Sequence, residues 1–249
     1  AASYAIFFSP WWLFLAVVEA FVIFGLLEYF AMAERKGFFI NRYLGLTFGA
    51  LLPLPFYFPG DAAILTAAIL CLFIFNFHRR LKEHAMVSTS LTLFGLIYIA
   101  WSFSFLTKIR TLDHGALWVF YLIFIIKSGD AAAYFVGRRF GTHKYIVHIS
   151  PNKSVEGAIA GFLTTILLSL GSKLYLRHVP MSHLAVLGVL LGIIGQLGDL
   201  AESLLKRDAG VKDSGAIPGL GGVLDVVDSL LLAFPVAYYY LTTMQGLYW

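Results

Sequence analysis

Runs of about 18 to 25 apolar residues recur along the whole chain, and this recurrence restricts the possible folds more than any other feature. A helix of this length crosses roughly 30 Å of hydrocarbon. Hydrophobic residues make up 59% of the 249 positions and charged residues 13%, whereas soluble domains have about 25% charged residues. A transmembrane β-barrel would instead show alternating segments of about ten residues. The sequence therefore predicts an all-α integral membrane protein, built as a polytopic helical bundle.

Eight candidate spans can be placed along the chain, and the second contains Pro53, Pro55 and Pro59. These prolines remove backbone donors and disrupt a helix unless neighbouring groups compensate. We expect residues 1–110 to form N-terminal transmembrane helices. We expect residues 111–249 to form a catalytic transmembrane region. The expected spans are 8–32, 40–58, 62–78, 86–106, 115–137, 155–171, 182–200 and 228–246, and the expected polar cytoplasmic loops are 138–154 and 199–228.

The distribution of lysine and arginine predicts the orientation in the membrane. The connections after the first, third, fifth and seventh spans hold thirteen of the eighteen basic residues, from Arg35 to Lys212. Because cytoplasmic loops carry an excess of these residues, we expect those connections to face the cytoplasm. Eight spans leave both ends outside, so we also expect one further helix ahead of residue 1. The absence of appended domains suits a bacterial inner membrane.

The stretch "GQLGDLAESLLKRDAGVKDSG", residues 195–215, carries a first group of polar side chains. If the seventh span continues through it as a helix, Asp199, Glu202, Ser203 and Lys206 lie on one face. A carboxylate, a hydroxyl and an ammonium group would then be aligned at the end of a membrane helix. A solvated helix end explains the same pattern without any function.

The stretch "KDSGAIPGLGGVLDVVD", residues 212–228, interrupts the apolar sequence with glycines and two acids. Glycine permits backbone amides to approach an anion closely. Asp225 and Asp228 lie three residues apart on the first turn of the last helix, where carboxylates also favour the helix dipole. Together with nearby cations, this pattern indicates a divalent metal ion that holds phosphates, and oxygen ligands select Mg²⁺. The nearby basic side chains are those of Lys206, Arg207 and Lys212.

A third polar group lies in and after the fifth span. Lys127 and Asp130 are three apart inside an apolar run. Each such residue costs roughly 2.5–3.5 kcal/mol at a helix centre, so the two should pair or face a polar cavity. A purely structural ion pair is the alternative. In "SPNKSVEG", Ser154 can cap the next span and Lys153 can meet a phosphate.

The stretch "SLLKRDAGVKDSGAIPGLGGVLDVVD" resembles the C-terminal signature of the phosphatidate cytidylyltransferases, also called CDP-diacylglycerol synthases. The stretches "GDAAAYFVGRRFG" and "SPNKSVEG" are similar to the middle region of that family, so the resemblance covers about residues 120 to 235. Leu220 and Val226 stand where the family usually has His and Arg, and the segment from Gly215 to Pro218 is one residue shorter. The matching residues are Ser203, Lys206, Arg207, Lys212, Asp213, Gly215, Pro218, Gly219, Gly221, Gly222, Asp225 and Asp228.

The resemblance implies an all-helical membrane enzyme of about nine spans, commonly a homodimer. Such an enzyme condenses CTP with phosphatidic acid to CDP-diacylglycerol and pyrophosphate in phospholipid biosynthesis, and it uses Mg²⁺. We expect Asp199, Asp225 and Asp228 to converge on one or two Mg²⁺ ions, with or without a monovalent cation. The expected catalytic residues are Asp199, Lys206, Arg207, Asp225 and Asp228. The expected substrate-binding residues are Asp130, Arg138, Lys153, Ser154, Ser203, Lys212, Asp213, Ser214, Gly221 and Gly222.

Three other interpretations fit parts of the pattern. A CTP-dependent kinase of a polyprenol or another lipid alcohol would transfer the γ-phosphoryl group and release CDP. A transporter could use Lys127, Asp130 and Asp199 as ion sites within the membrane, and an inactive scaffold is compatible with Leu220 and Val226. The net charge of +4 does not predict a nucleic acid partner, because basic residues in a membrane chain report its topology. We therefore expect no nucleic acid partner.

Overall fold

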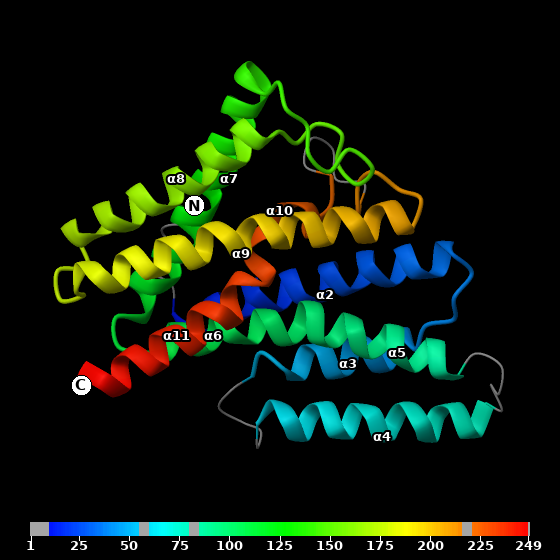
Figure 1. The fold of residues 1–249 in the computed structure, drawn as a ribbon. Helices are drawn as coiled ribbons and strands as arrows, with labels where there is room; N and C mark the ends of the chain where they lie inside the picture. The colour runs from blue at the N-terminus through cyan, green and yellow to red at the C-terminus, as the bar shows by residue number, and fades with distance from the viewer. Residues whose placement is uncertain (1–9, 55–59, 80–84, 216–220, 249) are drawn as a thin grey trace. The chain divides into compact units, whose positions relative to one another are not determined.

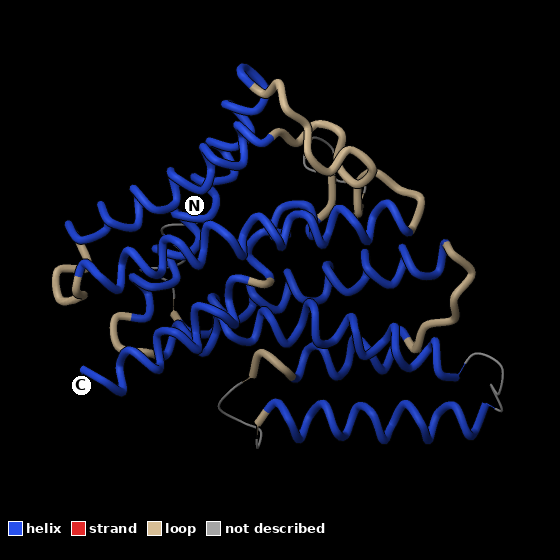
Figure 2. Tube along the Cα trace, viewed as in Figure 1, coloured by secondary structure: helices blue, strands red, loops and turns tan. Residues whose placement is uncertain are grey.

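The computed structural model describes residues 10–54, 60–79, 85–215 and 221–248, and regular structure in these residues is helical (Figure 2). One isolated bridge pairs Lys144 with Ser154. The predicted all-α class is therefore confirmed. The helices, labelled in Figure 1, are α2 (Trp11–Arg35), α3 (Arg42–Leu51), α4 (Asp61–Arg79), α5 (Ala85–Gly95), α6 (Ser102–Thr111), α7 (Gly115–Phe140), α8 (Val155–Gly171), α9 (Met181–Asp208), α10 (Val223–Leu231) and α11 (Ala233–Tyr248), with a π-helical turn at Leu96–Trp101 and a 3₁₀ turn at Ser172–Leu174.

Six helical segments in the described residues are long and apolar enough to cross a membrane. They correspond to the first predicted span and to the fourth through eighth. The third predicted span corresponds to α4, whose apolar part, Asp61–Phe77, is shorter. The six segments are Trp11–Arg35, Ala85–Thr111, Gly115–Phe140, Val155–Leu174, Met181–Asp208 and Val223–Met244.

The predicted second span, residues 40–58, differs from the structure. Its helix is α3, which has ten residues and ends at Leu51. Proline has no N–H to donate to the carbonyl four residues earlier, so Pro53 explains the early end. Pro55 and Pro59 lie outside the described residues.

The chain divides into two compact units. The first lies within Ala1–Lys108 and Lys206–Val227, and the second within Ile109–Leu205 and Asp228–Trp249. In the first unit, buried amides and hydroxyls form hydrogen bonds with one another: Nδ2 of Asn41 donates to Oγ of Ser88 at 3.1 Å, and Nδ2 of Asn76 donates to Oγ1 of Thr89 at 2.9 Å. The predicted division at residue 110 concerns where catalysis occurs and stays a prediction.

In the second unit, small residues bring α7 and α8 close together. A Cβ atom on Gly157 would lie 2.6 Å from the carbonyl oxygen of Ala133, and one on Gly161 would lie 2.9 Å from that of Gly129. Membrane helices associate closely where such small residues face each other. The start of α8 matches the sequence prediction, because Oγ of Ser154 accepts a hydrogen bond from the Gly157 N–H at 3.2 Å.

Candidate active site

A cavity of about 550 Å³ lies in the second unit, between α7, α8, α9 and the connection from α7 to α8. Its lining combines charged side chains with apolar ones such as Ile126 and Leu191. Five of the residues predicted from the sequence line this one cavity. They are Asp130, Arg138, Lys153, Ser154 and Asp199.

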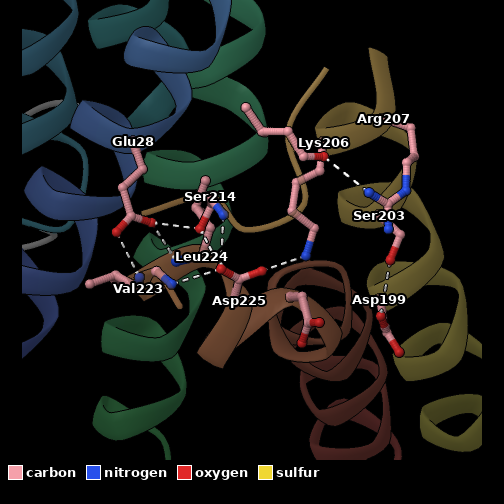
Figure 3. Close-up of polar contacts among 12 residues, drawn as sticks. Glu28, Asp199, Ser203, Lys206, Arg207, Ser214, Val223, Leu224 and Asp225 are labelled. Atoms are coloured by element: carbon pink, nitrogen blue, oxygen red, sulfur yellow. Dashed lines mark hydrogen bonds and ion pairs between the residues drawn. The ribbon is translucent and has the colours of Figure 1, made fainter. Parts of the chain in front are cut away.

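An ion pair joins the two sides of this cavity. The predicted continuation of the seventh span is confirmed, because α9 extends to Asp208 and carries Asp199 in its interior. Nζ of Lys153, which precedes α8, lies 2.8 Å from Oδ2 of Asp199. Oγ of Ser203 donates to Oδ1 of the same carboxylate at 3.5 Å (Figure 3). Lys153, which was expected to meet a phosphate, therefore faces Asp199, which was expected to bind a metal ion.

Other polar residues that the sequence patterns did not single out also line the cavity. Nζ of Lys144 donates to the carbonyl of Asn152 at 3.2 Å, and Nε2 of Gln196 donates to the carbonyl of Ala158 at 2.9 Å. Burial, and then the negative charge of Asp199, raise the pKa of Tyr145. This tyrosine therefore keeps its proton at neutral pH and can donate a hydrogen bond into the cavity.

A second, more open groove of apolar residues adjoins this cavity. The two share Tyr145, Ala158, Gly192 and Gln196 in their lining. The groove is completed by branched and aromatic side chains of α8 and α9, such as Ile159, Phe162 and Leu197. An amphipathic molecule can therefore place its polar end in the cavity and an apolar chain along the groove.

The expected pairing of Lys127 with Asp130 is confirmed, and two further partners belong to it. Nζ of Lys127 lies 3.0 Å from Oδ2 of Asp130, 3.4 Å from Oδ1 of Asp228 and 2.8 Å from Oγ of Ser229. Oγ of Ser229 in turn donates to Oδ2 of Asp130 at 2.7 Å. Two carboxylates within the membrane helices thus share one ammonium group, which lowers the cost of placing them there.

In the first unit, the carboxylate of Asp225 is surrounded by donors (Figure 3). Its Oδ2 accepts from the backbone N–H and the hydroxyl of Ser214, each at 2.9 Å, and from the Gly222 N–H at 2.7 Å. Nζ of Lys206 forms an ion pair with Oδ1. A carboxylate has about two lone-pair positions on each oxygen. Three of these contacts converge on Oδ2, and Lys206 contacts Oδ1.

The remaining predicted residues of the first unit lie beside this carboxylate in the sequence. Lys212 and Asp213 are exposed, and Nη1 of Arg207 donates to the Val211 carbonyl at 3.2 Å. Gly221 has a φ of +78°, which a residue with a Cβ atom rarely adopts. Val226 is 36% exposed, and Leu220 lies outside the described residues.

The three carboxylates predicted to bind metal are each paired with a lysine. These pairs are Asp199 with Lys153, Asp225 with Lys206, and Asp228 with Lys127. The described residues contain no group of three or more His, Cys, Asp or Glu side chains arranged to hold a metal ion. The donors are hard oxygens that suit Mg²⁺, and a metal ion would exchange with ammonium groups that already sit on them. The metal site stays a prediction.

Comparison with known proteins places the chain in a family. A sequence model of the group described as "Cytidylyltransferase family" matches residues 1–244. The chain belongs to this family. Several relatives bear the name phosphatidate cytidylyltransferase, among them proteins from three different bacteria. The one from Bacillus subtilis is 43% identical over 58% of this chain and 55% of its own length. The one from Chlamydia muridarum is 38% identical over 68% of this chain and 59% of its own length. The one from Synechocystis is 30% identical over 98% of this chain and 93% of its own length.

The match to several relatives is partial. This cytidylyltransferase-family chain spans 55% and 59% of the lengths of the Bacillus and Chlamydia proteins. The family match nevertheless reaches over both units, so it includes the cavity of the second unit and the Asp225 contacts of the first.

Proposed function

We propose that this protein condenses CTP with phosphatidic acid to form CDP-diacylglycerol and pyrophosphate. Membership of the cytidylyltransferase family and the names of the relatives support this activity. The observation that carries the proposal is the joint lining of the polar cavity and the apolar groove in the second unit. A phospholipid has the matching chemistry, with a charged headgroup next to apolar chains.

In the proposed reaction, an oxygen of the lipid phosphate attacks the α-phosphorus of CTP. The bond between the α-phosphorus and the oxygen that bridges to the β-phosphorus breaks, and its electrons leave with pyrophosphate. The attacking phosphate is already an anion at neutral pH, so no strong general base is required. The barrier is mainly the approach of two anions, and catalysis should depend on positioning and on positive charge.

Lys153 and Arg138 would bind the lipid phosphate in this scheme. Both line the cavity, and the Lys153 ammonium group can exchange Asp199 for a phosphate oxygen because both are anionic acceptors. The acyl chains would lie along the groove between α8 and α9. Ser154, at the start of α8, would stabilise the loop that carries Lys153.

The departing pyrophosphate would be stabilised by Lys206, Arg207, Lys212 and the amides of Gly221 and Gly222. Ser203, Asp213 and Ser214 would also contribute to substrate binding. We further propose that Asp199, Asp225 and Asp228 hold Mg²⁺, with Asp130 as an additional acidic group. Bound Mg²⁺ would neutralise phosphate charge at this site. Asp225 would take part by exchanging Lys206 for the metal, which would free that lysine for a phosphate.

We also propose that the protein is a homodimer in a bacterial inner membrane, with the site facing the cytoplasm. The excess of basic residues near Lys144 supports this orientation. A Lys144→Cys variant in a Cys71→Ala background should react with a membrane-impermeant maleimide only after the cells are opened. A Lys173→Cys variant, beyond the other end of α8, should react in intact cells. The reverse pattern would contradict the orientation.

Labelled CTP tests the activity and separates it from its alternatives. Purified protein, Mg²⁺ and phosphatidic acid should convert α-labelled CTP into a labelled liponucleotide and γ-labelled CTP into labelled pyrophosphate. Transfer of the γ label to a lipid alcohol with release of CDP would favour the kinase. Unchanged CTP would favour a transporter or an inactive scaffold.

A further inference from the structure

Glu28 of α2 holds the start of α10, although the two lie far apart in the sequence (Figure 3). The Val223 N–H donates to Oε1 of Glu28 at 2.8 Å, and the Leu224 N–H donates to Oε2 at 2.9 Å. The hydroxyl of Ser214 donates to Oε2, also at 2.9 Å. All four residues belong to the first unit. One carboxylate therefore connects α2, the loop after α9 and the first turn of α10.

The first turn of α10 needs an acceptor from elsewhere in the chain. The first N–H groups of a helix have no partner within it, and a side chain at the residue before the helix usually supplies one. Here that residue is Gly222, which has no side chain. Glu28 takes over this role and also places a negative charge at the positive end of the helix dipole.

The glycines around Glu28 leave space for its carboxylate. A Cβ atom on Gly222 would lie 2.5 Å from Oε2 of Glu28, and one on Gly215 would overlap Oε1. The backbone at both positions thus packs directly against the carboxylate. Gly215 and Gly222 belong to the sequence stretch that resembles the family signature, so part of this glycine pattern is explained by Glu28.

Ser214 couples Glu28 to Asp225. Its Oγ lies 2.9 Å from Oε2 of Glu28 and 2.9 Å from Oδ2 of Asp225. A hydroxyl has one proton and can donate to one of these carboxylates at a time. The N–H groups of Ser214 and Gly222 also donate to Asp225, so Asp225 keeps its orientation while the hydroxyl serves Glu28.

We propose that Glu28 is a positioning residue for the nucleotide. By capping α10 and holding Ser214, it fixes the segment that carries Asp225 and the Gly221 amide, so that Asp225 can hold Mg²⁺ and the Gly221 amide can face the phosphates of CTP. Glu28 itself does not touch the substrate; it acts through Ser214 and the first turn of α10. This inference rests on the proposed function, in which this segment binds the phosphates.

The test is the Glu28→Gln variant. It keeps the size of the side chain but replaces one acceptor oxygen with an NH₂ group, so at least one of the three donors loses its partner. The kcat/KM for CTP should fall about tenfold or more, because small displacements of positioned groups slow such reactions strongly. The KM for phosphatidic acid should stay within about twofold, because its proposed site does not include this loop. Hydrogen exchange at the Val223 and Leu224 amides should become faster.

Glu19→Gln is the matched control. Glu19 lies on the same helix, and within the described part of the chain its carboxylate oxygens accept no hydrogen bond. This change removes an acidic side chain from α2 without touching Ser214 or α10. It should leave both substrate dependences and the exchange of the Val223 amide at their wild-type values.

A double-mutant cycle tests the coupling through the hydroxyl. Ser214→Ala and Glu28→Gln should have effects on kcat/KM for CTP that are not additive, because both changes break the same contact. Additive effects would contradict the proposed route through Ser214.

Two results would overturn the role of Glu28. One is a wild-type kcat/KM for CTP in Glu28→Gln, and the other is an equal loss of kcat/KM for both substrates together with a lower melting temperature.

If the wild type binds CTP but forms no liponucleotide, the proposed function fails by itself. The dissociation constant for CTP then tests the positioning role of Glu28. About tenfold weaker CTP binding in Glu28→Gln supports this role, and unchanged CTP binding contradicts it. A wild type that does not bind CTP contradicts both proposals.

Discussion

Nζ of Lys153 lies 2.8 Å from Oδ2 of Asp199, and the two residues line the same cavity, Lys153 from the loop before α8 and Asp199 from α9. The ammonium group is thus held where an anionic headgroup could replace the carboxylate. Lys153→Gln should raise the KM for phosphatidic acid about 10- to 100-fold, because a charge-assisted hydrogen bond is lost. Initial rates at varied lipid concentration measure this effect.

The control for Lys153 is Lys173→Gln. Lys173 follows the other end of α8 and donates to the carbonyls of Arg177 and Val179, each at 2.7 Å. The Lys173→Gln variant should leave the KM for phosphatidic acid unchanged. If both variants raise this KM equally, the weaker lipid dependence reflects general damage to α8 and not the loss of a headgroup contact.

Asp228→Asn should reduce kcat at least about 100-fold without unfolding the protein, because the negative charge that would hold Mg²⁺ is lost. The amide still offers an oxygen to the Ser229 N–H, which donates to Oδ1 of Asp228 at 2.6 Å. Asp208→Asn is the control, since Asp208 is exposed and pairs with Lys36. An Asp228→Asn variant with the wild-type rate would eliminate this role.

Magnesium should bind the folded protein, and this can be observed without turnover. Saturating Mg²⁺ should raise the melting temperature of the wild type by about 5 °C, because a ligand of the native state stabilises it. The rise should be smaller in Asp228→Asn. Chelation should abolish activity, and added Mg²⁺ should restore it. A melting temperature of the wild type that does not respond to Mg²⁺ would contradict the metal site.

The connection before α9 should make stability depend on pH. Burial lowers the pKa of His178 below its usual value of 6.5, and the charges of His114 and Lys173 lower it further. The His114 and His178 rings are stacked with their centroids 4.6 Å apart. The unfolded chain therefore binds more protons than the native one as the pH falls below about 7, and the native state loses stability.

The melting temperature of the wild type should consequently fall between about pH 7.5 and 5.5. His178→Gln should show a shallower decrease over the same range, because its side chain does not titrate. Equal slopes for the two proteins would show that other groups cause the dependence.

The membrane helices were predictable because their signal is local. The apolar runs at α7, α8 and α9 and the Ser154 cap are read from neighbouring residues. The length of the second span was overestimated, because hydropathy alone extends the apolar run across Pro53, whereas the helix ends at Leu51. The prolines of this segment had correctly indicated that its helix would be disrupted.

The site was only partly predictable, because its contacts join distant residues. The pairing of Lys127 with Asp130 follows from helical spacing, but its contact with Ser229 spans 102 positions. Glu28 lies in the last two turns of α2, and no sequence pattern connects it with Leu224, 196 positions later. Such contacts depend on tertiary packing, which periodicity does not encode.

The most direct test of the central claim is the yield of pyrophosphate and liponucleotide from the wild type and from Asp199→Asn in the same bilayer discs containing phosphatidic acid. If the reaction takes place in the cavity lined by Lys153 and Asp199, the wild type forms the two products in equal amounts. Asp199→Asn, folded to the same extent, then forms neither. Equal rates of product formation by the two proteins would contradict the account.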